Sequence, residues 1–350
     1  MNNFFETSFG RKIQFYPGYK ERYPVLTEKE VLSVYQNTDE SVPFYAFMKD
    51  SFEYGMMIDF LTHHGVQGPW ESALDLGGAE GTISRHLKSE GIVKRAECLD
   101  IKDFSKTLPD GLYDQYRRKF RLYSLVNRLG IKKPNLIVNF PAHFCYHPAF
   151  SDKYYNLEAR QSGRIDNYYT HSIYDHQIKY DFISALLCFP YFDLRKLFPQ
   201  ISSLLNQGGI FYFITDYWWS QINSSQIIGN FPYACQRLTK EDLITYFKQF
   251  HPDETPYVQK KYDYYHCTMP APVVSTYVKL ARDSGLDLIA IKRQITQEAD
   301  GERILYAPQD LNRDPRTKLD DVLTDIHQFR QDVKIEDLMT AFVIGAFVKR

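Results

Sequence analysis

The residues best suited to hold a ligand form one short glycine-rich segment, Leu74-Asp75-Leu76-Gly77-Gly78-Ala79-Glu80-Gly81-Thr82. A short apolar stretch precedes it and apolar residues with helical spacing follow it, which predicts a strand joined to a helix. Glycines at such a turn let the backbone bend sharply and approach a ligand closely. The acidic residue Asp75 at the end of the strand makes this pattern more specific than glycines alone.

A second polar anchor, Asp100, ends the next predicted strand, residues 95–100. A carboxylate at that position can accept hydrogen bonds from both hydroxyls of a ribose. The turn and the acid together predict a nucleoside cofactor across neighbouring strand ends. An NAD-binding turn is the alternative, but the glycine spacing, the acid before the turn and the later Gly208-Gly209 pair weigh against it.

Further along the chain, apolar strand patterns alternate with amphipathic helix patterns. The predicted strands are residues 181–187, 210–215, 286–291 and 341–348, and the predicted helices are residues 82–89, 193–205 and 273–283. This alternation predicts a mainly parallel sheet covered by helices on both faces.

The order of these motifs resembles class I S-adenosylmethionine-dependent methyltransferases of the seven-stranded Rossmann-like type. Asp75 to Gly81 resembles that family's D/E-x-G-x-G-x-G motif, with Ala79 in place of the middle glycine. Residues 205–213 resemble the Gly-Gly turn into the fifth strand, and residues 341–350 the antiparallel seventh. The expected fold is therefore α/β: a Rossmann-like, seven-stranded, mainly parallel sheet, with a helical N-terminal segment and cap insertions.

This resemblance implies S-adenosylmethionine as cofactor and gives roles to particular residues. The turn formed by Asp75, Gly77, Gly78, Ala79 and Gly81 is expected to contact the methionine part of the cofactor. Asp100 is expected to hold the ribose and Ile101 to pack on the adenine. The residue that contacts the adenine amino group usually follows the third strand, which is obscure in this sequence. Asp166 and Asp175 are both candidates, and Asp166 is preferred for its spacing to Asp181.

Two residues are candidates for a general base that deprotonates the methyl acceptor. Asp216 directly follows the predicted strand 210–215, at the edge where ligands bind in such sheets. Its alternative role is that of a loop carboxylate beside core aromatic residues. His266 lies shortly before the predicted helix 273–283, in chain that is typically close to the acceptor.

A histidine pair and a basic segment are explained without a metal or a nucleic acid. His143 and His147 have helical spacing, but prolines flank them and no ligand set is completed, so no metal is predicted. Residues 112–134 combine basic residues with apolar ones at helical spacing, which favours an amphipathic helix with a solvated basic face. The alternative for this stretch is a docking surface for an anionic acceptor.

Composition limits the partners and the compartment. The 350-residue chain carries a formal net charge of −1, which argues against nucleic acid as a partner. Five scattered cysteines without a CxxC pattern favour reduced thiols. Neither a signal peptide nor a membrane-spanning run is evident, so a cytoplasmic protein is expected.

The expected organisation has two parts. Residues 1–68 form a helical N-terminal segment, either a lid or a contact in a homodimer. Residues 69–350 form the methyltransferase core, with insertions at about 104–162, 216–271 and 296–336.

The expected reaction is methyl transfer to an oxygen or nitrogen of a small organic molecule in specialised or natural-product metabolism. The aromatic content, 16% of residues, suits a cap lined with rings over the acceptor. The alternatives are methylation of a macromolecule or a carrier-bound substrate, and a non-catalytic scaffold that only binds the cofactor.

Overall fold

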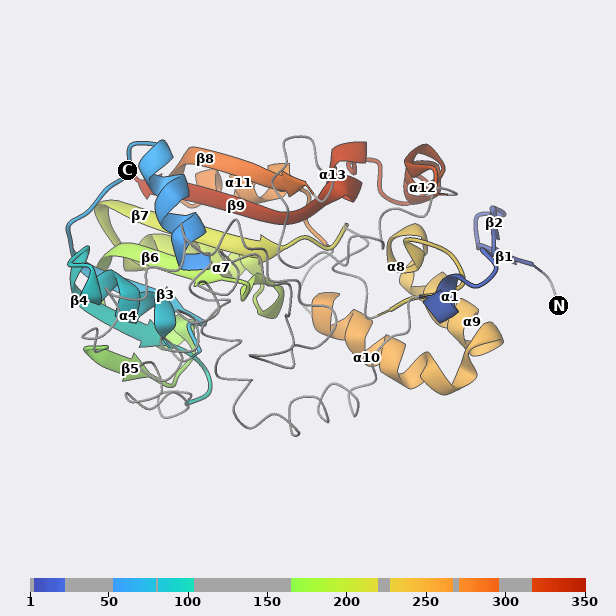
Figure 1. Cartoon of the computed structure of the whole chain (residues 1–350), viewed down its shortest axis with the longest axis horizontal. Coiled ribbons are helices and arrows are strands. Elements are labelled where there is room, and N and C mark those ends of the chain that lie inside the picture. Colours follow the sequence, from blue (N-terminus) through green and yellow to red (C-terminus); the bar gives the residue numbers. More distant parts are fainter. Residues whose placement is uncertain are drawn as a thin grey trace, which may run out of the picture.

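The molecule is built on one seven-stranded sheet with the strand order β5-β4-β3-β6-β7-β9-β8 (Figure 1). The computed structural model describes residues 3–22, 53–79, 81–103, 165–219, 227–266, 271–295 and 317–350. The strands of this sheet are β3 (Trp70–Leu76), β4 (Val93–Leu99), β5 (Asn167–Tyr169), β6 (Tyr180–Leu186), β7 (Leu205–Asp216), β8 (Leu286–Ile295) and β9 (Thr340–Lys349).

Strand direction completes the resemblance to the class I methyltransferase fold. β3 pairs in parallel with β4 and β6, and the parallel pairing continues to β5 on one side and β7 on the other. β9 is inserted antiparallel between β7 and β8. From β3 the strand order runs outward through β4 to β5, and on the other side of β3 it runs through β6 to β7. This order, together with the antiparallel last strand β9, confirms the predicted fold.

Helices cover both faces of the sheet because each presents one apolar stripe to it. On one face lie α4 (Thr82–Ser89) and the helical residues 53–63, which pack Met57, Ile83 and Leu87 against the strands. On the other lie α7 (Leu194–Leu204) and α11 (Val274–Asp283), with η2 (Ile173–Asp175) and η3 (Phe189–Tyr191) beside them.

The start of the chain packs against a distant insertion. β1 (Phe4–Glu6) and β2 (Lys12–Gln14) form an antiparallel hairpin that was not predicted, and α1 (Tyr19–Arg22) follows. The hairpin lies beside helices from residues 227–266 (Figure 1). It buries Phe5 and Ile13 against them. These are α8 (Ala234–Arg237), α9 (Lys240–Phe250), η4 (Pro252–Glu254) and α10 (Thr255–His266).

The last insertion ends in α12 (Leu319–Ile326) and α13 (Ile335–Met339) before β9. The basic stretch 112–134 and the His143–His147 pair lie outside the described residues. In the described part of the chain, no helix is long and apolar enough to cross a membrane.

Candidate active site

The glycine-rich turn joins β3 to α4, as the sequence predicts. Gly77, Ala79 and Gly81 have φ values of 66°, 44° and 71°, in the left-handed region. A side chain at Gly77 would bring its Cβ within 2.7 Å of the Cβ of Cys188. The turn therefore requires glycine at position 77 for both conformation and space, and its surface is bare backbone.

The predicted ribose acid lies against this turn. Asp100 directly follows β4, and its Oδ2 accepts a hydrogen bond of 3.2 Å from the backbone N–H of Ala79. Its Oδ1 accepts another, of 3.0 Å, from the N–H of Lys102. Ile101, beside it, is 77% exposed. The glycine-rich turn and Asp100 thus meet at neighbouring strand ends, and the exposed apolar side chain of Ile101 lies next to them.

Four polar side chains form a row beneath the turn, and we call them the floor row: Ser184, Asp75, Cys98 and Tyr168. They lie in register across β6, β3, β4 and β5. Ser184 donates a 3.0 Å hydrogen bond to Asp75 Oδ1, and the Tyr168 hydroxyl donates one of 2.7 Å to the carbonyl of Ala79. A Cβ at Gly78 would lie 2.9 Å from Cys98 Sγ and closer still to Asp75 Oδ2, so the row excludes a side chain there.

The floor row has unusual acid–base properties because it is buried. Asp75 is 1% exposed, and its Oδ2 has no hydrogen-bond partner among the described residues. The pKa of Asp75 is raised to about 7, mainly by burial and to a lesser extent by the nearby carboxylates of Asp100 and Glu53, against the hydrogen bond from Ser184. Burial also raises the pKa values of Cys98 and Cys188, so both thiols are protonated at neutral pH.

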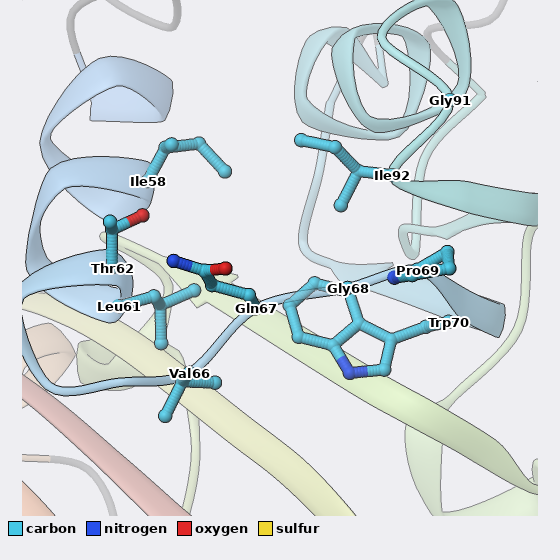
Figure 2. A pocket seen from close by; sticks show the side chains of 10 residues that line it. All are labelled: Ile58, Leu61, Thr62, Val66, Gln67, Gly68, Pro69, Trp70, Gly91 and Ile92. Atoms are coloured by element: carbon cyan, nitrogen blue, oxygen red, sulfur yellow. The ribbon is translucent and has the colours of Figure 1, made fainter.

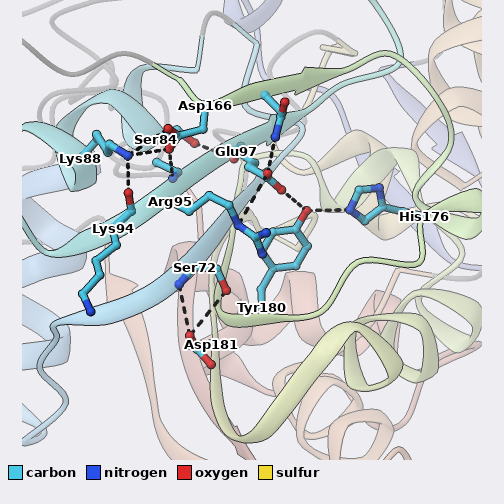
Figure 3. Close-up of polar contacts among 12 residues, drawn as sticks. Ser72, Ser84, Lys88, Lys94, Arg95, Glu97, Asp166, His176, Tyr180 and Asp181 are labelled. Carbon is cyan, nitrogen blue, oxygen red and sulfur yellow. Dashed lines mark hydrogen bonds and ion pairs between the residues drawn. The ribbon is translucent and has the colours of Figure 1, made fainter.

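Asp166 lies elsewhere than predicted. It precedes β5 instead of following it, so it is not at the carboxyl edge of the third strand in space (Figure 3). Its carboxylate accepts hydrogen bonds from the N–H of Ala96 at 2.7 Å and from Lys88 Nζ at 2.8 Å. The sequence favours Asp166 by its spacing to Asp181 alone, because a strand of three residues leaves no pattern in the sequence that would place the strand. Asp175, the alternative, follows β5 within η2.

A buried hydrogen-bond network fixes the chain after β5 (Figure 3). Glu97 on β4 accepts from the Tyr180 hydroxyl at 2.5 Å and from Asn167 Nδ2 at 2.6 Å. His176 lies 2.8 Å from the same hydroxyl and 3.0 Å from His171. The network connects β4, β5 and β6 and so holds the segment that borders the predicted adenine side.

Of the two candidate bases, Asp216 lies on the side of the sheet beyond β6. Asp216 is the last residue of β7, opposite Phe342 of β9, and is half-buried. His266 is the last residue of α10, and its side chain lies outside the described residues. Tyr217 and Trp219 are buried packing residues: the Tyr217 hydroxyl donates to Asp337 at 2.6 Å, and Arg330 lies over the Trp219 ring.

A separate pocket of about 370 Å³ lies near the amino end of β3 (Figure 2). Ile58, Leu61, Val66, Trp70 and Ile92 give it mainly apolar walls. It is at the opposite end of β3 from the glycine turn, so it is distinct from the cofactor site. Among the described residues, no cluster of three or more His, Cys, Asp or Glu side chains could hold a metal ion.

Comparisons with known proteins give similarity in fold. No protein-family model and no curated protein sequence matches the chain. Among solved structures, geranyl diphosphate C-methyltransferase from Streptomyces coelicolor is 12% identical, with a TM-score of 0.42 over 86% of this chain and 79% of that one. The N-methyltransferase NodS from Bradyrhizobium japonicum is 9% identical, with a TM-score of 0.37 over 87% and 96%.

A third similar structure is phosphoethanolamine N-methyltransferase 2 from Haemonchus contortus, at 14% identity and a TM-score of 0.40 over 84% of this chain and 52% of that one. Similarities of this size do not transfer an activity.

Proposed function

We propose that this chain binds S-adenosylmethionine over the carboxyl ends of β3 and β4 and transfers its methyl group to a small organic molecule. One observation carries the proposal. A bare-backbone turn and a carboxylate meet at neighbouring strand ends, with 3.2 Å between Ala79 N and Asp100 Oδ2, in a sheet with the class I strand order. A nucleoside that carries an amino-acid tail needs this pair of features.

The residues present fit this cofactor. Asp100 retains lone pairs that can accept the ribose hydroxyls, since each carboxylate oxygen can accept more than one hydrogen bond. Ile101 offers an exposed apolar surface for the adenine ring. Gly77, Gly78, Ala79 and Gly81 leave room for the methionine part, and the buried Asp75 below them supplies negative charge for its ammonium group. Asp166 is left out of the proposed site because Lys88 and Ala96 engage it.

The cofactor supplies a methyl group on a sulfonium, so this chain has to align an acceptor and remove a proton. Asp216 and His266 are the proposed bases, and the proposed acceptor atom is an oxygen or nitrogen. We further propose a cytoplasmic enzyme without a metal in which residues 69–350 form the core and residues 1–68 contribute a lid or a homodimer contact.

Calorimetry with S-adenosylhomocysteine tests the cofactor assignment. Asp100→Ala should weaken binding by roughly 1–3 kcal/mol, because it leaves ribose hydroxyls and the Ala79 N–H without an acceptor. Asp283→Ala is the matched control, since it removes an exposed carboxylate that pairs with Lys279 at the surface. Failure of the unaltered protein to bind S-adenosylhomocysteine would exclude the proposed function, and equal affinity of both variants would remove Asp100 from the site.

A further inference from the structure

We infer that Tyr168 is a positioning residue of the cofactor site: its hydroxyl holds Ala79 in the conformation that exposes the turn and joins the turn to the chain after β4. The inference rests on the proposed function, because it concerns the same site. Tyr168 would touch the turn and not the reacting atoms.

One hydroxyl lies within hydrogen-bond distance of two backbone carbonyls and shares its single proton between them. The Tyr168 oxygen lies 2.7 Å from the carbonyl of Ala79 and 3.1 Å from the carbonyl of Lys102. The first carbonyl belongs to the turn after β3, and the second to the segment after Asp100. A single side chain of β5 thereby connects the two halves of the site.

Ala79 needs such support because it is not a glycine. Its φ of 44° lies in the left-handed region, which L-residues with a Cβ occupy at a cost. Residues in such conformations persist where their surroundings fix them from several directions. Asp100 holds the N–H of Ala79 and Tyr168 holds its carbonyl, so the peptide groups on both sides of the residue are fixed.

The neighbouring strand residue provides a matched control. Tyr169 follows Tyr168 in β5, so its side chain points to the opposite face of the sheet. Its hydroxyl interacts with Glu97, and its ring packs against His176. Tyr169→Phe removes a hydroxyl from the same strand without touching the turn.

The experiment compares Tyr168→Phe and Tyr169→Phe by calorimetry with S-adenosylhomocysteine, well below the melting temperature of each variant. Loss of the hydroxyl that the two carbonyls share should raise the Kd of Tyr168→Phe roughly tenfold, whereas that of Tyr169→Phe should stay within about twofold. Binding by the unaltered protein with a Tyr168→Phe affinity inside that twofold range would overturn the inference and leave the proposed function standing.

A rescue experiment tests the part played by Ala79. Glycine adopts positive φ without the penalty that a Cβ brings. In the Tyr168→Phe background, Ala79→Gly should therefore recover a substantial part of the lost affinity, about threefold or more, as a double-mutant cycle would record. A purely structural role of Tyr168 in the sheet would give no recovery, and that result would overturn the link between Tyr168 and the turn.

Discussion

At the scale of single residues, Asp75 is the most informative group in the molecule. It is fully buried, one of its oxygens has no partner among the described residues, and its pKa is raised to about 7 mainly by burial. The polar groups around it include Ser184, Asp100, Glu53, the backbone N–H of Ser84 and the thiols of Cys98 and Cys188. A cationic ammonium over the turn would favour its charged form, which predicts that cofactor binding expels a proton.

The proton release can be measured by calorimetry at pH 6.5 with S-adenosylhomocysteine in buffers of different ionisation enthalpy. About half to one proton should be released, because Asp75 is mostly protonated before binding and ionised afterwards. Asp75→Asn, which keeps the side chain's size, should abolish the buffer dependence. A binding enthalpy that is the same in every buffer for the unaltered protein would contradict this prediction.

The same pKa sets the sign of the pH dependence of stability. The folded pKa lies above the unfolded value of about 3.9, so the folded protein favours protonated Asp75. The contribution of protonated Asp75 to the free energy of unfolding is complete below the unfolded pKa and is lost as the pH rises through the folded pKa of about 7. The loss in the cofactor-free protein is on the order of 4 kcal/mol, and urea unfolding at several pH values, with Asp75→Asn as reference, would record it.

The candidate bases differ from Asp75 because they are expected to affect turnover and not cofactor binding. Asp216 ends β7, and β6 separates that strand from β3 and its turn. Asp216→Asn or His266→Ala should lower the rate of methyl transfer by about 10²-fold or more, with little change in Kd for S-adenosylhomocysteine. Methyl-labelled cofactor and the low-molecular-mass fraction of a cell extract provide the assay. Full activity in both variants would exclude both residues.

At the scale of elements, the sequence predicted those helix bounds that apolar periodicity and flanking glycines determine. α4 spans Thr82–Ser89 as predicted, because Gly81 precedes it and Gly91 follows it closely. β7 begins at Leu205, earlier than predicted, because the residues around Gly208 and Gly209 continue the strand through an irregular pairing with β6. A Gly-Gly pair usually signals a turn, and only pairing with a neighbouring strand can override that signal.

The floor row contains site residues that the sequence alone did not predict. Asp75 was predicted from its motif, but Ser184, Cys98 and Tyr168 join the site only because three further strands align with β3. β5 has three residues and exists through its pairing with β4, so no local pattern marks Tyr168. The same short strand explains the difference at Asp166, because without a local pattern for β5 the spacing to Asp181 could not show on which side of the strand Asp166 lies.

At the scale of the whole molecule, one carboxylate ties together three segments that are distant in sequence. Asp325 of α12 is 3% exposed and accepts hydrogen bonds of 2.8 Å from Arg237 of α8 and from Arg11, which precedes β2. The N-terminal hairpin and two insertions are thereby held as one unit outside the sheet. None of these residues touches the glycine turn or Asp100 in the described structure, so this contact should affect stability and not cofactor binding.

Asp325→Asn tests this separation between stability and binding. It keeps the shape of the side chain but leaves the buried Arg237 without a negative partner, which should lower the free energy of unfolding by about 3–5 kcal/mol. Asp320→Asn, exposed on the same helix, should change it by less than about 0.5 kcal/mol. Urea unfolding measures both, and the folded Asp325→Asn variant should bind S-adenosylhomocysteine within about twofold of the unaltered protein. Equal stability of the two variants would show that apolar contacts such as those of Phe5, Ile13 and Tyr246, and not Asp325, hold the three segments together.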